Sequence, residues 1–592
     1  MRKVPLVIAL WAGTAFGLIE GILLSASRGY PAVLAPDKLS AHVLWFAPLY
    51  DATIYSLVAF GLVVLFWLLK NRVDAARWTL SVSIFVFTFL GTFSVLFSLR
   101  VIHLAAALIL ALGLTLAIVR RARVLEDDLV NNLTRRLVLI PSLLLALALG
   151  TFGWEIASET WQHRRLPPAS PDSPNVLVIV LDTVRYDRFT EAGQNGLLPH
   201  LDHLARRGVR YTNAWSSTSW SLPSQASILT GRYPHEHGAD WPALALSEQY
   251  PTLAEFFGGR GYVTGAFSGN SAWVTPEYLG RGFLRFRAYE AENFLRRTAY
   301  GRVIDKLLRP VGYHSAGRGR KANTINAEVL HFLADYPNRP FFVYLCYMDV
   351  NQAFHHQSLN RGFWRPRARL RDVIAAYDGS LRDLDARIGE LMAILEARGA
   401  LKNAVVVVTS DHGESFGSEA SKSGLRDHDP MGHGTHLYPE QTAVPLFVIS
   451  PGRVPGGQIS DHTVSVRQIP ATISNVLGLA GTPFVGESLP LVLNASSTDR
   501  PLAAVLATLK YGEANMQAVV RDRVMYLRNT KENRRLEELY DMRHDPFAER
   551  NIALDSPLLS PLRQLLSSLL DTDSNPQERR RRASGGAPAE SR

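Results

Sequence analysis

Residues 219–238, SWSLPSQASILTGRYPHEHG, decide how the larger part of this chain is interpreted. Ser221 stands two residues before Pro223, at the start of a run with helical character, and proline is favoured in the first turn of a helix. The Ser221 hydroxyl is therefore predicted to lie at the positive end of a helix dipole, where an oxyanion, a phosphate or a sulfate is stabilised. A serine at this position can also be a simple N-cap, so other segments must decide its role.

Two continuous apolar runs rich in β-branched residues are typical of buried parallel strands: 175–181 (NVLVIVL) and 404–410 (AVVVVTS). The first run ends at Asp182, and the second ends at Asp411 and His412. Ligands of open α/β sheets bind at the carboxyl ends of the strands. We therefore expect these three side chains and Ser221 to form a site for a divalent metal ion. Carboxylate and imidazole ligands suit Zn²⁺ or Mn²⁺, while a shell of oxygens favours Ca²⁺ or Mg²⁺.

Further motifs follow along the chain. They are, as they stand, Ser221-Leu222-Pro223-Ser224-Gln225 with Thr230-Gly231-Arg232; Tyr377-Asp378-Gly379; Tyr438, Glu440 and Val444-Pro445-Leu446; and Leu539-Tyr540-Asp541, Asp545-Pro546, Glu549 and Asn551. On these motifs, residues 175–553 resemble the sulfatase family of the alkaline phosphatase superfamily. The resemblance implies an α/β alkaline-phosphatase-like fold, a sulfuric ester hydrolase, a bound Ca, Mn or Zn ion, and a formylglycine made from Ser221.

Three polar residues stand where the family places basic ones. Gln225 takes the position of an arginine, Asn270 that of a lysine, and Asn351 that of a histidine that contacts sulfate. Relatives in the same superfamily use an unmodified serine or threonine for phosphoryl transfer. A phosphodiesterase or a phospho-headgroup transferase that uses Ser221 directly therefore remains an alternative, as does a non-catalytic member of the family.

Histidine and arginine side chains supply candidates for the remaining roles. His433 and His436, in the run GHGTHLY, are candidates for the proton donor or for a contact to the transition state. Arg185 is a candidate clamp on sulfate or phosphate, since the guanidinium fork suits such oxyanions, and an ion pair with Asp187 is the alternative. In the expected mechanism, the Ser221 oxygen or a formylglycine hydrate attacks sulfur or phosphorus, and a covalent intermediate then breaks down.

Five apolar runs precede this part of the chain, over about residues 4–26, 42–69, 76–98, 101–119 and 137–155. Most of them reach the roughly 18 to 20 residues needed to cross a bilayer, so residues 1–158 are expected to form a multi-pass membrane region. Lys and Arg are richer before the first run and in the connections after the second and fourth, which places the N-terminus in the cytoplasm. Five spans would then put the catalytic domain of this cell-membrane protein outside the cytoplasm. The third and fourth runs are separated by a very short break, and a four-span arrangement would invert this orientation.

The expected domain order is a Pro/Ser-rich linker over 159–174, the α/β catalytic domain over 175–500, a C-terminal subdomain over 501–572, and a disordered basic tail over 573–592. In the subdomain, residues 502–507 and 516–528 are expected to form short strands, with a helix over 557–570. The fold class is thus a multi-pass α-helical membrane region followed by an α/β sulfatase domain with a small antiparallel C-terminal subdomain.

The net charge of +10 comes largely from arginines that flank the apolar runs and from the tail. Because the chain carries no nucleic-acid-binding motif, no nucleic-acid partner is expected. The expected partners are membrane lipids and a sulfated or phosphorylated substrate, which could be a glycan, a lipid or a small molecule. The single cysteine, Cys346, excludes internal disulfides and any cysteine-based zinc site.

Overall fold

The computed structural model of this protein describes residues 3–26, 40–69, 75–99, 102–122, 128–170, 172–289, 297–308, 320–359, 370–417, 431–484, 486–491, 504–512, 514–531 and 534–572. The chain divides into two compact units. The first unit contains Met1–Arg164, Tyr289–Ser315 and Asn360–Pro366, and the second contains Arg165–Ala288, Ala316–Leu359 and Arg367–Arg592.

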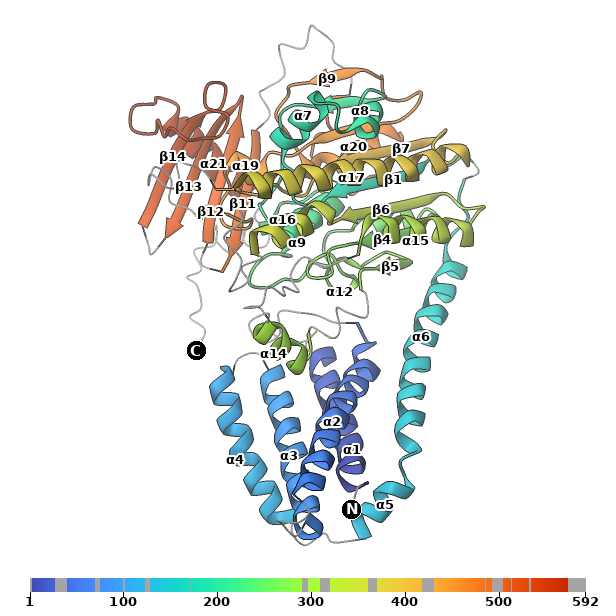
Figure 1. The fold of residues 1–592 in the computed structure, drawn as a ribbon. Helices are drawn as coiled ribbons and strands as arrows, with labels where there is room; N and C mark the ends of the chain where they lie inside the picture. The colour runs from blue at the N-terminus through green and yellow to red at the C-terminus, as the bar shows by residue number, and fades with distance from the viewer. Residues whose placement is uncertain are drawn as a thin grey trace, which may run out of the picture. The chain divides into compact units, whose positions relative to one another are not determined.

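The first unit is helical (Figure 1). Its helices are α1 (Val4–Ala26), α2 (Val43–Leu68), α3 (Ala75–Ser98), α4 (Leu104–Ala122), α5 (Asp128–Arg135), α6 (Leu139–Arg165) and α14 (Ala299–Leu308). Each of the five predicted apolar runs therefore contains a helix. Within the described residues, four segments are long and apolar enough to cross a membrane: Val4–Ser25, Val43–Leu68, Trp78–Ser98 and Leu139–Arg165. The fourth run forms a shorter apolar helix, Leu104–Arg120.

Small residues allow α1 and α2 to pack closely. A Cβ atom built on Gly13 would lie 2.5 Å from the Cα atom of Ala52, and one on Gly17 would lie 2.6 Å from the Cα atom of Pro48. Glycine is therefore needed at both positions, as is common where apolar helices approach each other backbone to backbone.

Two acidic side chains are buried within this unit. Ser94 Oγ lies 2.8 Å from Glu20 Oε2 and 3.5 Å from Asp51 Oδ2, so one hydroxyl links both carboxyl groups. The backbone N–H of Ala299, at the start of α14, donates to Glu20 Oε1 at 2.6 Å. Helix α14 lies within the range 175–500 that the sequence predicted as the catalytic domain. These contacts show that it packs into the helical unit instead.

The second unit is built on an eight-stranded mixed sheet with the order β5-β4-β6-β1-β7-β8-β2-β9. The strands are β1 (Asn175–Leu181), β2 (Val209–Tyr211), β4 (Val263–Ser268), β5 (Arg285–Arg287), β6 (Phe341–Tyr347), β7 (Ala404–Thr409), β8 (Leu446–Ile449) and β9 (Gln458–Ser460). The five strands from β5 to β7 are parallel, and β8 pairs antiparallel with both β7 and β2. A further pair of short strands, β3 (Ala214–Trp215) and β10 (Val464–Ser465), lies outside this sheet.

Side chains cover both faces of the central strand β1. Leu177, Ile179 and Leu181 belong to an apolar core into which α15 and α17 also pack. The alternate residues Val176, Val178 and Val180 are equally buried. This explains the continuous apolar run in the sequence, because a parallel strand that is buried on both faces has no polar face to alternate with.

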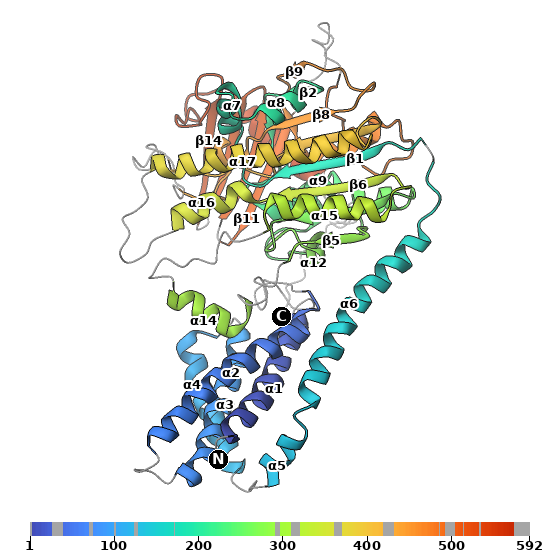
Figure 2. The same ribbon diagram turned by 45° about the vertical axis from the view of Figure 1, so that its right-hand side comes forward.

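Helices surround the sheet, and α17 runs along β1 and β7 while α15 lies beside β4 and β6 (Figures 1 and 2). The helices of this unit are α7 (Tyr186–Gln194), α8 (Pro199–Ala205), α9 (Ser221–Thr230), α10 (Pro234–His237), α11 (Leu253–Gly258), α12 (Pro276–Leu279), α15 (Ala322–Asp335), α16 (Asp349–Leu359), α17 (Leu370–Ala397), α19 (Pro439–Thr442), α20 (Ile469–Val476) and α21 (Leu559–Thr572), with a 3₁₀ turn at Val466–Gln468.

A four-stranded antiparallel sheet forms the C-terminal part of the unit. Its strands are β11 (Ala504–Tyr511), β12 (Ala514–Arg521), β13 (Val524–Lys531) and β14 (Arg534–Asp541). The prediction of one strand over 516–528 was wrong, since Asp522 and Arg523 adopt φ angles of 49° and 56° and turn the chain back as a hairpin. Two consecutive residues in this conformation match the twist of the strands that they join.

Two further sequence predictions concern the linker over 159–174 and the tail over 573–592. Helix α6 continues to Arg165, so the beginning of the predicted linker over 159–174 is helical. The predicted basic tail over 573–592 lies outside the described residues.

Candidate active site

Ser221 is the first residue of α9, the helix that the sequence predicted at this position. The helix ends at Gly231, whose φ of 71° a residue with a Cβ atom would adopt only with strain. Ser221 itself is 2% exposed. Its hydroxyl therefore occupies a buried position at the positive end of the helix.

The acids and the histidine predicted to bind a metal ion lie around this hydroxyl. Asp182 follows β1, while Asp411 and His412 follow its parallel neighbour β7. Ser221 Oγ lies 3.1 Å from His412 Nε2 and 3.5 Å from Asp182 Oδ2. One ligand atom each from Asp182, Asp411 and His412 lies within 4.8 Å of the others. The structure thus brings together the four residues that the sequence singled out.

Neutral amides contact both acids. Asn270 Nδ2 donates to Asp182 Oδ2 at 2.8 Å and to Ser221 Oγ at 3.1 Å. Asn351 Nδ2 donates to Asp182 Oδ1 at 3.1 Å, and Gln225 Nε2 donates to Asp411 Oδ2 at 2.9 Å. The three positions where the motifs depart from the sulfatase pattern therefore face the candidate metal ligands directly.

The profile of the Sulfatase family matches residues 174–479, which is more than half of the chain. The chain belongs to the sulfatase family. The resemblance seen in the motifs is thereby confirmed, and with it the class of sulfuric ester hydrolases in the alkaline phosphatase superfamily.

Individual relatives are distant. Arylsulfatase K of Xenopus laevis is 24% identical over 390 residues, which are 55% of this chain and 68% of that protein. An arylsulfatase of Clostridium perfringens is 24% identical over 452 residues, 64% of this chain and 90% of that protein. The solved phosphonate monoester hydrolase from Silicibacter pomeroyi superposes with a TM-score of 0.52 and 20% identity, over 68% of this chain and 95% of its own. Together with the sheets and the apolar helices described above, these similarities confirm the expected fold class.

Burial shifts the pKa values of the ligand set in this sulfatase. It raises the pKa of Asp182 to about 7, with help from the charge of Asp411, and it raises the pKa of Asp411 to about 6. Burial and the neighbouring His433 lower the pKa of His412 to about 4. His412 is thus a neutral imidazole, and because Nδ1 lies 2.9 Å from the carbonyl oxygen of Gly413 and donates to it, Nε2 presents a lone pair to the site.

This donor set fits a divalent metal ion. Two fully buried carboxylates and a neutral imidazole nitrogen are the ligand types that such ions take in proteins. Sulfatases generally use a divalent metal, and the cost of burying the two charges is the cost that a bound cation would remove.

The remaining candidates from the sequence are His433, His436 and Arg185, and their surroundings differ. His433 lies beside His412, with 4.6 Å between the ring centroids. His436 is fully buried, and its ring nitrogens lie 2.9 Å from Gln441 Nε2 and 3.3 Å from the backbone N–H of Tyr438. Arg185 makes a two-pronged ion pair with Asp187, at 2.9 and 2.7 Å, which is the alternative that the sequence offered for it.

Sequence reasoning missed two residues near the site. His355 lies on α16 and Glu414 follows His412 and Gly413, and both lie close to His433. A signal for His355 exists, because Asn351 and His355 are four residues apart and so share one face of a helix. That signal needs the helix to be recognised first, and the polar run DVNQAFHH has little apolar periodicity.

Proposed function

We propose that this sulfatase is a membrane-anchored, metal-dependent hydrolase that cleaves sulfate esters, or phosphate esters, outside the cytoplasm. The observation that carries the proposal is the Ser221 hydroxyl, buried at the start of α9 and 3.1 Å from His412 Nε2. Asp182 and Asp411 lie beside it, and the family supplies the reaction class.

Asp182, Ser221, Asp411 and His412 would hold the metal ion, with Ca, Mn or Zn as the candidates. A bound ion supplies Lewis-acid charge and lowers the pKa of the hydroxyl that attacks. The two carboxylates and the imidazole fix its position, and Asn270 orients the Ser221 oxygen through its 3.1 Å hydrogen bond.

The remaining steps follow from the side chains of the chain itself. The Ser221 oxygen, or the hydrate of a formylglycine at this position, forms a bond to sulfur or phosphorus, and the bond to the leaving alcohol oxygen breaks. The backbone N–H groups at the start of α9 stabilise the negative charge that develops. His433 is the first candidate for the proton donor or for a contact to the transition state, because it adjoins His412, and His436 is the second.

Hydrolysis assays test this proposal. The full-length protein, purified in detergent, should hydrolyse nitrophenyl sulfate or nitrophenyl phosphate. A chelator should remove the activity, and an added divalent metal ion should restore it. Absence of turnover with both classes of ester, in protein that contains metal, would overturn the proposal.

A second candidate function is phosphoryl chemistry, as a phosphodiesterase or a phospho-headgroup transferase that uses Ser221 directly. The neutral amides of Gln225, Asn270 and Asn351 favour it, because they contact the acids where typical sulfatases place basic side chains. Mass spectrometry of the tryptic peptide 211–232 from the native host separates the two. A loss of two hydrogens at Ser221 would indicate formylglycine and a sulfatase, while an unmodified serine would favour phosphoryl transfer. A metal content near zero would instead support a non-catalytic member.

We also propose that residues 1–158 anchor the enzyme in the cell membrane as a multi-pass region, with 175–500 as the catalytic domain outside and 501–572 as its subdomain. The four long apolar helices within the described residues, with the shorter apolar helix Leu104–Arg120 as a further span, are compatible with this anchoring. Substrates would be sulfated or phosphorylated glycans, lipids or small molecules, with membrane lipids as neighbours and without a nucleic-acid partner. Protease accessibility of the catalytic domain in intact cells tests the orientation, since a protected domain would contradict it.

A further inference from the structure

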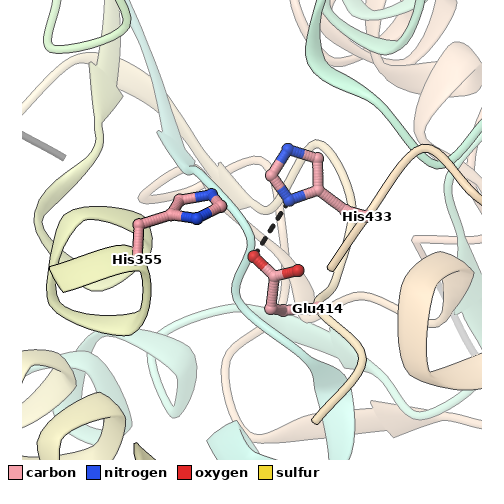
Figure 3. A group of neighbouring side chains, drawn as sticks. All are labelled: His355, Glu414 and His433. Carbon is pink, nitrogen blue, oxygen red and sulfur yellow. Dashed lines mark hydrogen bonds and ion pairs between the residues drawn. The ribbon is translucent and has the colours of Figure 1, made fainter. Parts of the chain in front are cut away.

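A second cluster of metal-ligand side chains lies beside the first one. His355, Glu414 and His433 point toward one another (Figure 3), and one ligand atom from each lies within 4.8 Å of the others. His433 Nδ1 lies 2.9 Å from Glu414 Oε2. The three residues come from α16, from the segment after β7 and from the segment before α19, so the fold rather than one local motif brings them together.

Several polar atoms around this cluster are buried without a hydrogen-bond partner. Two belong to the cluster itself, Glu414 Oε1 and His355 Nδ1, and a third, Asn351 Oδ1, belongs to the residue one turn before His355 on α16. Glu414 is fully buried and Asn351 is 1% exposed. A buried polar atom that stays unpaired costs about 1–3 kcal/mol, so two such atoms within one cluster of metal-ligand residues support a ligand that pairs with them.

The charges in this neighbourhood support the same conclusion. Asp182, Asp411 and Glu414 are three fully buried carboxyl groups. One divalent cation bound to Asp182 and Asp411 neutralises these two carboxylates and leaves the negative charge of Glu414. A protonated His433 would cancel that remaining charge, so the site would be neutral and not positive. A second divalent cation with neutral histidines would give the site a net positive charge, which suits an anionic ester.

We propose that His355, Glu414 and His433 bind a second divalent cation, next to the cation of the first cluster. This inference rests on the proposed function, because the second cation would supply the positive charge that contacts the ester in the proposed reaction. Two imidazoles and a carboxylate suit Zn²⁺ or Mn²⁺. Tetrahedral zinc with bonds of roughly 2.0 Å needs ligand atoms roughly 3.3 Å apart, and the ligand atoms of this cluster lie within 4.8 Å of one another.

The second cation would supply the positive charge that basic side chains supply in typical sulfatases. Asn270 and Asn351 stand in place of a lysine and a histidine, so the charge that they would have supplied is missing from the site. Two adjacent cations can stabilise the attacking and the leaving oxygen of an in-line displacement together. His433 would then contact the transition state through the cation and not as a proton donor.

Metal counting tests this inference. The full-length protein is stripped with a chelator, incubated with Zn²⁺ alone or Mn²⁺ alone, freed of excess metal and analysed by mass spectrometry of the elements. We expect about two ions per chain in the unaltered protein and about one in His355→Ala and in His433→Ala. Asp411→Ala should also retain about one ion, and His355→Ala combined with Asp411→Ala about none.

The control is His331→Ala, which removes an exposed histidine of α15 and should leave the count unchanged. His355→Gln keeps much of the side-chain volume, so it should lose the same ion even if the alanine variant folds poorly. One ion per chain in the unaltered protein, or two ions in both histidine variants, would overturn the inference. Ester hydrolysis by a protein with one ion would overturn the second site and leave the hydrolase, whereas two ions without turnover would keep the site and overturn the hydrolase.

Discussion

The active site of this sulfatase has two sides that differ in how they are built. On one side, Asp182, Asp411 and His412 stand directly after two buried parallel strands and match the expected metal ligands. On the other side, Asn270 and Asn351 put neutral amides where the family motifs place basic groups. From this difference we infer that the groups proposed to activate Ser221 are retained. The positive charge that would contact the ester would then come from another source, for which the second cation is our candidate.

The largest effect is expected on the metal side. Replacing His412 or Asp411 with alanine removes a ligand of the first cation, so turnover should fall by at least about a thousandfold and metal binding to this cluster should be lost. Steady-state assays and metal analysis measure both effects. His544→Ala, at an exposed histidine, is the control and should change neither. Full activity in the Asp411 or His412 variant would contradict the site assignment.

A smaller loss is expected on the amide side. Asn270→Ala removes hydrogen bonds to both Asp182 and Ser221. Hydrogen bonds to charged groups contribute about 1.5–3 kcal/mol, which corresponds to roughly 10- to 100-fold in kcat/KM. Asn270→Asp should be worse, because it adds a negative charge beside Asp182. If the Asn270→Asp variant were as active as the unaltered protein, the charge at position 270 would have no effect on catalysis, and this prediction would be wrong.

The pH dependence of stability sharpens the comparison further. In the metal-free protein, the raised pKa values of Asp182 (about 7) and Asp411 (about 6) mean that the folded state holds protons which the unfolded state has released. Stability should therefore fall as pH rises from about 4 to 7. A cation that binds the ionised pair offsets this loss, so it should raise Tm more at pH 8 than at pH 5. Equal gains at both pH values would contradict this, and Asp182→Asn combined with Asp411→Asn should flatten the metal-free profile.

The smallest effect on activity is expected at Arg185, which belongs neither to the metal side nor to the amide side of the site. Its guanidinium pairs with Asp187 and donates to the carbonyl oxygen of Glu414 at 3.0 Å. Lysine cannot reproduce this fork, so Arg185→Lys should lower stability by about 1 kcal/mol and Tm by roughly 2–4 °C, with little change in kcat. The control is Arg382→Lys in an exposed pair with Asp383. A large loss of kcat in Arg185→Lys would indicate that Arg185 contacts the substrate.

Local patterns in the sequence were enough to predict part of this structure. The strands β1 and β7, the start of α9 and the residues that follow them could be read from apolar runs and a proline, because these signals lie within a few residues of the site. The β12–β13 hairpin was missed, since Asp522-Arg523 is not a common turn pair and the flanking residues read as one run. The place of α14 could not be predicted, because it depends on contacts with residues far away in the chain. His355 was missed because its helix has little apolar periodicity, and its contacts with Glu414 and His433 are also distant in the chain.

The most direct test of the account compares kcat/KM of the full-length protein with that of Ser221→Ala, in the presence of a divalent metal ion and nitrophenyl sulfate or phosphate. Ser568→Ala, at an exposed serine of α21, is the matched control. We expect Ser221→Ala to lose turnover by at least about a thousandfold while it keeps its fold, because it removes the oxygen proposed to form the covalent intermediate. Turnover in Ser221→Ala equal to that of the control would contradict the account.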